Sequence, residues 1–242
     1  MSIPIFIMTL KQFWNRPARV FLLGCFLAFP LFMEFMMKRV MNQNISAETA
    51  SHMVPAFVMV IGAGIVGQDI TDGVLPLILS RPIKRYQYLI SKWMAVATLA
   101  LSMGLADTSF HLLLSYGFAA QALQNFQLLW IPQTFISAAG CTAVMMLLSC
   151  LLPGAADVGI LLLTFAVYFV MMMLQHGAHV PGMEDIGTQL LSIAFPSFDL
   201  TEITAPRSLL SIDVGRYVAV VFVSLLGSVI VLNQKELSYG SH

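Results

Sequence analysis

Two ionisable residues one helical turn apart, Asp107 and His111, lie inside a long apolar stretch of this sequence. Residues at positions i and i+4 share one face of an α-helix. An acid and an imidazole on one face could relay a proton or line a polar path through a helical bundle. The pair could equally be a hydrogen-bonded contact that fixes helix packing, and we favour this interpretation because a proton relay more often involves several such groups.

Few other residues suggest chemistry. His176, His179 and Glu184 are metal ligands by type, but they lie in a polar connecting segment and predict no metal site. The cysteines form no Cys-x-x-Cys pair and lie in apolar runs, which predicts small buried side chains. These cysteines are Cys25, Cys141 and Cys150.

Sequence motifs for catalysis or nucleotide binding are absent. The chain contains no GxxxxGK[ST] phosphate loop, no HExxH zinc motif and no GxSxG nucleophile elbow. We therefore expect that the chain is not an enzyme, that it binds no cofactor itself, and that energy for any transport comes from a partner or an ion gradient.

The composition predicts a membrane protein. Hydrophobic residues make up 58% of the chain and charged residues 10%, whereas soluble domains contain about 25% charged residues. The formal net charge is zero, which gives no indication of a nucleic-acid partner. The expected surroundings are a lipid bilayer.

The elements that must position these residues are apolar stretches long enough to cross a bilayer as helices. They predict an all-α membrane protein with six transmembrane helices in a single domain covering residues 1–242. The second stretch also places Ala63 and Gly67 at a spacing typical of close helix packing, within the bundle or across a dimer. The six predicted spans are Ala18–Met37, Met53–Gln68, Tyr88–Ala119, Leu128–Leu152, Val158–Gln175 and Val214–Leu232.

Residues 1–16 have apolar positions at helical spacing and precede Pro17, which predicts an N-terminal interfacial helix. A retained signal anchor is the alternative, and both interpretations leave the N-terminus in the cytoplasm. Six spans then place the C-terminus there too, and the basic residues are mostly cytoplasmic, as the positive-inside rule requires. Residues 176–213 become extracytoplasmic, and their apolar middle, 186–195, is expected to enter the interface or pack on the bundle.

The charged passage 69–86 becomes the main cytoplasmic loop. Gly73 allows the chain to turn out of the second span, and the next residues offer an apolar ridge followed by a basic rim. We predict a docking surface for a partner protein, while contact of the basic residues with lipid headgroups is the alternative. The ridge comprises Val74, Leu75, Leu77, Ile78 and Leu79, and the rim Arg81, Lys84 and Arg85.

This passage resembles a signature of ABC-2-type exporter permeases. An acid stands at Asp69, an acid–glycine pair at Asp72 and Gly73, the apolar run "LILSRP" ends at Pro82, and Lys92 matches a lysine at the start of the third span. The interfacial helix, the six spans and the stretch "FPSFDL" also fit that family.

The resemblance implies a short cytoplasmic coupling helix that docks on an ABC ATPase subunit, where ATP and magnesium bind. It also implies a second permease subunit, identical or related, and a location in a prokaryotic cytoplasmic membrane. The residues expected to bind the ATPase are Asp69, Asp72, Gly73, Leu77, Ile78, Arg81, Pro82, Lys84 and Arg85.

Two other functions remain open from the sequence. An ion-gradient carrier would use Asp107 and His111 as its relay, and its transport would be independent of ATP. A membrane module that anchors or regulates a partner would move no substrate. A membrane enzyme is the least favoured class, because no nucleophile or metal constellation occurs.

Overall fold

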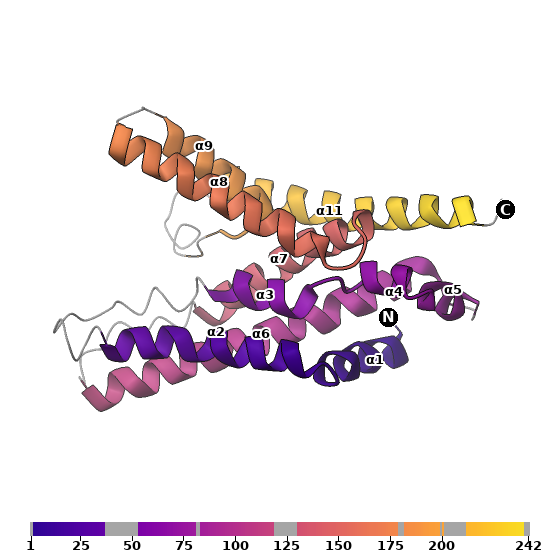
Figure 1. The fold of residues 1–242 in the computed structure, drawn as a ribbon, viewed down its shortest axis with the longest axis horizontal. Coiled ribbons are helices and arrows are strands. Elements are labelled where there is room, and N and C mark those ends of the chain that lie inside the picture. The colour runs from indigo at the N-terminus through magenta and orange to yellow at the C-terminus, as the bar shows by residue number, and fades with distance from the viewer. Residues whose placement is uncertain are drawn as a thin grey trace.

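The computed structural model describes residues 2–36, 53–80, 83–118, 130–178, 182–198, 200 and 212–239. Within these ranges all regular structure is helical (Figure 1). Five helical segments are long and apolar enough to cross a membrane, and α2 (Pro17–Met36) contributes a shorter apolar stretch, Pro17–Phe29. The chain thus has the character of an all-helical multi-pass membrane protein.

The chain begins with two consecutive helices. α1 (Ile3–Trp14) starts with a proline in its first turn and ends before Pro17, the first residue of α2. Proline is favoured there because the first turn of a helix needs no backbone N–H donor. α1 buries Ile5 and Phe13, and it packs along α6, where the Ser2 amide donates a hydrogen bond to Ser91 Oγ at 2.7 Å.

The second predicted span, Met53–Gln68, is not one continuous helix. It consists of α3 (Val54–Gly62), a turn over residues 63–66 and α4 (Gly67–Thr71), and α5 (Val74–Leu79) follows. Gly64 has a φ of 60°, in the left-handed region that other residues rarely adopt. The stretch Val54–Thr71 is still long and apolar enough to cross a membrane, as predicted, but a turn interrupts its helix.

The remaining helices are α6 (Arg85–Phe118), α7 (Trp130–Leu151), α8 (Ala156–Ala178), α9 (Met183–Ala194) and α11 (Ile212–Tyr239). Helices α6, α7 and α8 agree with the predicted spans within about three residues, α11 extends past the predicted end at Leu232, and α9 lies in the segment 176–213, for which no span was predicted. Part of the predicted start of the fourth span lies outside the described residues.

Helix α7 occupies the centre of the bundle and contacts α3, α6, α8 and α11. On one side lie α1, α2 and α6, and on the other lie α8, α9 and α11 (Figure 1). The start of α1, the end of α11 and helix α5 all lie at the same end of the molecule, which we call the α5 end (Figure 1).

Small residues allow the helices to approach closely. A Cβ atom on Gly140 of α7 would lie 2.6 Å from the ring of Tyr217 on α11, and the Tyr217 hydroxyl donates a hydrogen bond to the Ile136 carbonyl at 2.8 Å. The apolar segment 186–195 forms most of α9 and packs on α8. Its Gly187 faces Tyr168, where a Cβ atom would approach the ring to 3.1 Å.

The cysteine prediction holds for two of three residues. Cys141 and Cys150 are buried in α7, whereas Cys25 on α2 is exposed, contrary to the prediction. The outer face of α2 is apolar, and Cys25 lies on that face, where it points away from the core of the bundle.

Candidate functional site

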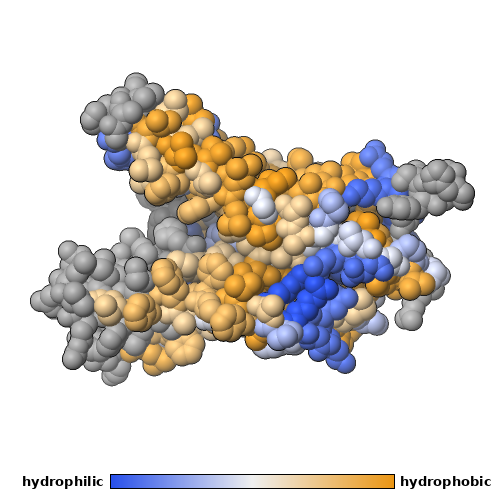
Figure 2. Space-filling view, in the orientation of Figure 1, coloured by the Kyte–Doolittle hydropathy of each residue, from blue (hydrophilic) through white to orange (hydrophobic). Residues whose placement is uncertain are grey.

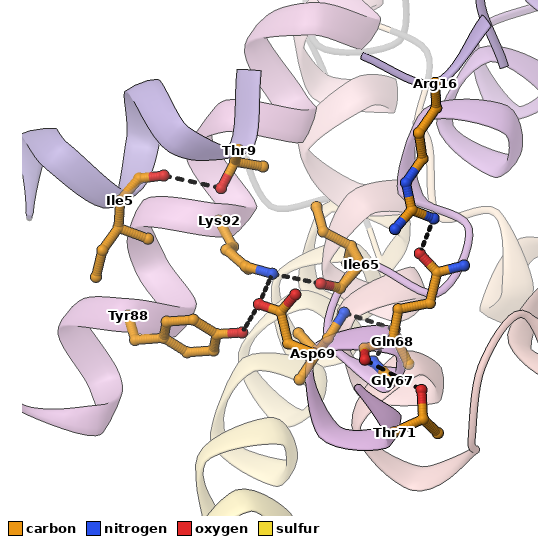
Figure 3. A network of polar contacts seen from close by, with 12 residues as sticks. Ile5, Thr9, Arg16, Ile65, Gly67, Gln68, Asp69, Thr71, Tyr88 and Lys92 are labelled. Carbon is orange, nitrogen blue, oxygen red and sulfur yellow. Dashed lines mark hydrogen bonds and ion pairs between the residues drawn. The ribbon is translucent and has the colours of Figure 1, made fainter. Parts of the chain in front are cut away.

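A buried ion pair joins α4 to α6 at the α5 end of the bundle (Figure 3). Tyr88 and Lys92 are one turn apart on α6 and therefore point the same way. Lys92 Nζ donates to Asp69 Oδ2 at 2.5 Å and also to the Ile65 carbonyl, while the Tyr88 hydroxyl donates to Asp69 Oδ2 at 2.7 Å. The Lys92 side chain is completely buried and that of Asp69 is 8% exposed. A charge pair removed from water in this way is stable only while both partners and their hydrogen bonds remain.

Backbone N–H groups in the turn between α3 and α4 have no helical partners. Side chains of two other helices accept hydrogen bonds from these groups. The Gly64 amide donates to Asp157 Oδ2 at 2.8 Å. The amides of Val66 and Gly67 both donate to Ser149 Oγ at 3.0 Å. Asp157 lies in the first turn of α8 and Ser149 is near the end of α7, so the turn is bound to the two helix ends that flank the α7–α8 connection.

The carbonyl groups of the same turn are bound by cationic side chains. Arg19 on α2 donates to the Ala63 carbonyl at 2.6 Å and to Gln68 Oε1 at 3.1 Å. Arg16 also donates to Gln68 Oε1 (Figure 3). With Lys92 on the Ile65 carbonyl, side chains from α2, α6, α7 and α8 all meet at this turn. Non-helical backbone at the level of a membrane is tolerated only when protein groups satisfy it in this way.

The glycines of this region permit backbone contact rather than helix packing. A Cβ atom on Gly64 would lie 2.5 Å from the Gly154 carbonyl oxygen, and one on Gly67 would lie 2.7 Å from that of Leu152. Gly67, one of the two small residues of the predicted packing motif, thus makes its close contact within the chain. However, the contact occurs between a turn and the α7–α8 connection, not along two helices.

Helix α5 projects at the end of this assembly. Gly73 precedes it with a φ of 68° and forms the expected turn. The predicted apolar ridge is smaller than the sequence suggested, because Leu75 is 4% exposed and Ile78 packs partly on the core. The side chain of Leu79 lies outside the described part of the chain; among the described side chains of α5, Leu77 is the large apolar one that is exposed, at 71%.

The other predicted docking residues occupy different settings. Asp72 and Lys84 are exposed. Arg85 is half-buried and donates to Asn233 Oδ1 on α11 at 3.1 Å, whereas Arg81 and Pro82 lie outside the described residues. Asp69 is buried against Lys92, so its carboxylate cannot lie on the exposed face that a docking surface requires.

The structure places Asp107 in α6 with a fully buried side chain. It follows Gly104 by three residues, and a Cβ atom on Gly104 would meet Thr134 of α7 at 2.7 Å and Val54 of α3 at 3.1 Å. Asp107 therefore lies on the inner side of α6. The side chains of His111 and Glu184 and the whole of His179 lie outside the described part of the chain. Among the described residues, no group of three or more potential metal ligands is present.

Most of the residues around the turn carry no signal in the local sequence. Ser149 and Asp157 are more than 80 positions from the amides that they bind, and no local pattern marks them. Tyr88 and Lys92 offered one signal, because their i, i+4 spacing places a phenol and an ammonium on one face. Gln68, Arg16 and Arg19 looked like ordinary residues near the membrane interface.

A large groove opens beside this turn. It has a volume of about 1200 Å³ and lies between α2 and α3 on one side and α8 and α9 on the other. Figure 2 shows that hydrophobic residues cover most of this face of the molecule, with hydrophilic residues gathered toward the α5 end. The groove's walls are mainly apolar, and Arg16 and Arg19 at the start of α2 and Gln68 on α4 line the part of the groove nearer the α5 end.

Comparisons with family models, curated proteins and solved structures find no match to this chain.

Proposed function

We propose that this chain is the membrane-spanning subunit of an ATP-driven exporter of the ABC-2 type. Six helices cross the membrane, with α2 as the first, and both termini are cytoplasmic. The subunit dimerises with itself or with a related permease, and a separate ABC ATPase subunit binds ATP and magnesium. Substrate movement is coupled to ATP hydrolysis through α5, the coupling helix.

The single observation that carries this proposal is the connection of an exposed α5 to a buried ionic lock. Leu77 is exposed on α5, and α4 immediately before it is held to α6 by Asp69, Tyr88 and Lys92. A partner that moves α5 would thereby move α6, because separating the buried Asp69–Lys92 pair would leave uncompensated charges and cost several kcal/mol.

The arrangement of the ends supports the proposed topology. The start of α1 and the end of α11 lie at the α5 end (Figure 1), and Lys84 and Arg85 follow α5 there, at the start of α6. Basic residues concentrate on the cytoplasmic side of membrane proteins. This placement favours a cytoplasmic α5 that an ATPase can reach.

A coupling mechanism also needs a point at which one helix can move relative to the next, and the turn at residues 63–66 provides it between α3 and α4. α3 and α4 need not move together, because no continuous helical hydrogen-bonding pattern joins them. Arg19 and Asp157 bind opposite backbone groups of the turn, so α2 and α8 would respond when it changes shape. Transport requires helix packing with two arrangements, and this turn lies where helices α2, α4, α6, α7 and α8 converge.

A Leu77→Ser variant tests the docking role. Burial of a leucine side chain in a partner contributes roughly 1.5–3 kcal/mol, so we expect at least about a tenfold loss of ATPase affinity with normal insertion and folding. The measurement is recovery of the ATPase with the tagged chain from membranes, followed by substrate-stimulated ATP hydrolysis.

The matched control is Leu151→Ser at the end of α7, an apolar side chain that is 47% exposed and lies outside α5. It should leave ATPase recovery unchanged. Equal recovery of the ATPase by wild type and Leu77→Ser would contradict the docking role of α5. Recovery of no ATPase by the wild-type chain would favour the membrane anchor or regulator.

The complete burial of Asp107 in α6 keeps the gradient-driven carrier as a second candidate. Asp107→Asn preserves the shape but cannot ionise. If Asp107 is structural, transport into inverted vesicles should persist at a substantial level and depend on ATP. Loss of transport in a normally assembled variant, together with sensitivity of the wild type to ionophores instead of ATP depletion, would identify the carrier.

A further inference from the structure

The groove between α2, α3, α8 and α9 has two chemically different ends. Its walls carry Phe26 from α2, Met59 from α3, and Leu162 and Phe165 from α8. Ligand sites generally occupy roughly 300–1000 Å³, so about 1200 Å³ can hold one elongated ligand. The wall chemistry is suited to a hydrocarbon body and not to a sugar or a peptide backbone.

The α5 end of the groove carries positive charge that no described carboxylate pairs with. Arg16 and Arg19 donate to Gln68 Oε1 and to the Ala63 carbonyl, and both acceptors are neutral. Asp157 lies near Arg19, but its Oδ atoms accept from the amides of Gly64 and Val158. Within the described residues, no carboxylate lies within ion-pair distance of either arginine, so Arg16 keeps its charge at the groove while Asp157 partly offsets that of Arg19.

Two guanidinium groups side by side recognise an oxyanion. Arginine presents its N–H donors in a planar fork that matches phosphate or carboxylate. The attraction is stronger beside apolar walls than in water, because the local dielectric constant is lower. Basic pockets between membrane helices on the cytoplasmic side are known to hold lipid headgroups.

We propose that the groove binds an anionic amphiphile, with its phosphate or carboxylate head at Arg16 and Arg19 and its apolar body along Phe26, Leu162 and Phe165. Binding itself needs no ATPase. That this amphiphile is the exported substrate rests on the function proposed above. The substrates would then be molecules with one anionic head and a hydrocarbon body.

The test uses the full-length chain in dodecyl maltoside, without an ATPase, and the anionic probe dodecyl phosphate. Calorimetric titration at a fixed detergent concentration should give saturable binding of one probe per groove. Dodecylphosphocholine should bind at least about tenfold more weakly because its charges cancel, and inorganic phosphate should show no saturation because it lacks the apolar body.

Two variants with matched controls examine each end. Arg16→Gln should weaken dodecyl phosphate binding at least about tenfold, while Lys11→Gln, which removes an exposed basic residue outside the groove lining, should change it by less than about twofold. Leu162→Trp should fill the groove and weaken binding similarly. Leu163→Trp, on the adjacent residue that does not line the groove, should not; these leucines are 55% and 62% exposed.

Several outcomes would overturn the proposal. Equal binding of dodecyl phosphate and dodecylphosphocholine would show an apolar groove without charge recognition. Saturable binding of inorganic phosphate would show a phosphate site instead. If the chain is a dimer that Leu162→Trp dissociates and Leu163→Trp does not, a second copy occupies the groove. None of these results bears on ATPase docking, which the Leu77→Ser experiment measures separately.

Discussion

The α3–α4 span and helix α8 are both apolar enough to cross a membrane, yet one is broken and the other is continuous. In the span Val54–Thr71, 56% of the most apolar 18-residue stretch is buried inside the protein, whereas in Ala156–His176 only 11% of the corresponding stretch is buried. The break in the first span has side chains from four helices bound to its backbone. Helix α8 has its outer face turned away from the protein, where no such donors or acceptors could reach it. A span can therefore leave the helical conformation only where neighbouring helices satisfy its backbone.

The largest expected effect comes from removing one charge of the buried pair. Lys92→Met removes the ammonium group from the buried Asp69 carboxylate, which then keeps only the hydrogen bond from the Tyr88 hydroxyl. The Ile65 carbonyl also loses its bond from Lys92. We expect the free energy of unfolding to fall by about 3–5 kcal/mol. Unfolding in mixed micelles of dodecyl maltoside and dodecyl sulfate, followed by circular dichroism, measures it.

The double variant Asp69→Asn with Lys92→Met is the control for that prediction. It removes both charges and keeps an acceptor for Tyr88, so it should recover much of the lost stability. A double variant as unstable as the single one would show that Lys92 contributes through packing and not through the charge pair.

A smaller effect is expected from Gly64→Ala at the break. The new Cβ atom would lie 2.5 Å from the Gly154 carbonyl oxygen, at a φ of 60°. We expect a loss of roughly 2–4 kcal/mol from backbone strain and steric overlap. Gly154 has the same φ of 60°, but a Cβ atom added there would have no other atom within 4 Å, so Gly154→Ala should cost only about 1–2 kcal/mol. Equal losses in the two variants would remove close approach as the reason for glycine at position 64.

The smallest expected change in the free energy of unfolding comes from removing a hydroxyl group at the break, compared with removing one on α8. Ser149→Ala removes the acceptor for the amides of Val66 and Gly67 and should cost about 1–3 kcal/mol. Thr164 on α8 only donates to its own helix, to the Ile160 carbonyl at 2.9 Å, and Thr164→Ala should change stability by less than about 0.5 kcal/mol. The same unfolding measurement compares them. Indistinguishable values would mean that other groups satisfy the break.

The helices themselves were largely predictable from the sequence. Helices α6, α7 and α8 begin and end close to the predicted spans, and α11 begins close to its own, because apolar length is a local property that the bilayer thickness sets. The turn at Gly73 was also predictable, since glycine before an apolar run is a local signal for a left-handed residue. The number of membrane crossings stays a prediction, because only part of α2 belongs to a described apolar stretch.

The tertiary structure alone decided which residues of the charged passage face outward and which are buried. The sequence grouped Asp69 with Asp72, and Leu75 with Leu77, but the structure buries the first of each pair and exposes the second. Burial of Asp69 depends on Lys92, 23 positions away, and the break before it depends on Ser149 and Asp157. Such partners meet only after the helices have packed, because the energy of a buried charge or amide is set by the groups around it and not by its neighbours in the chain.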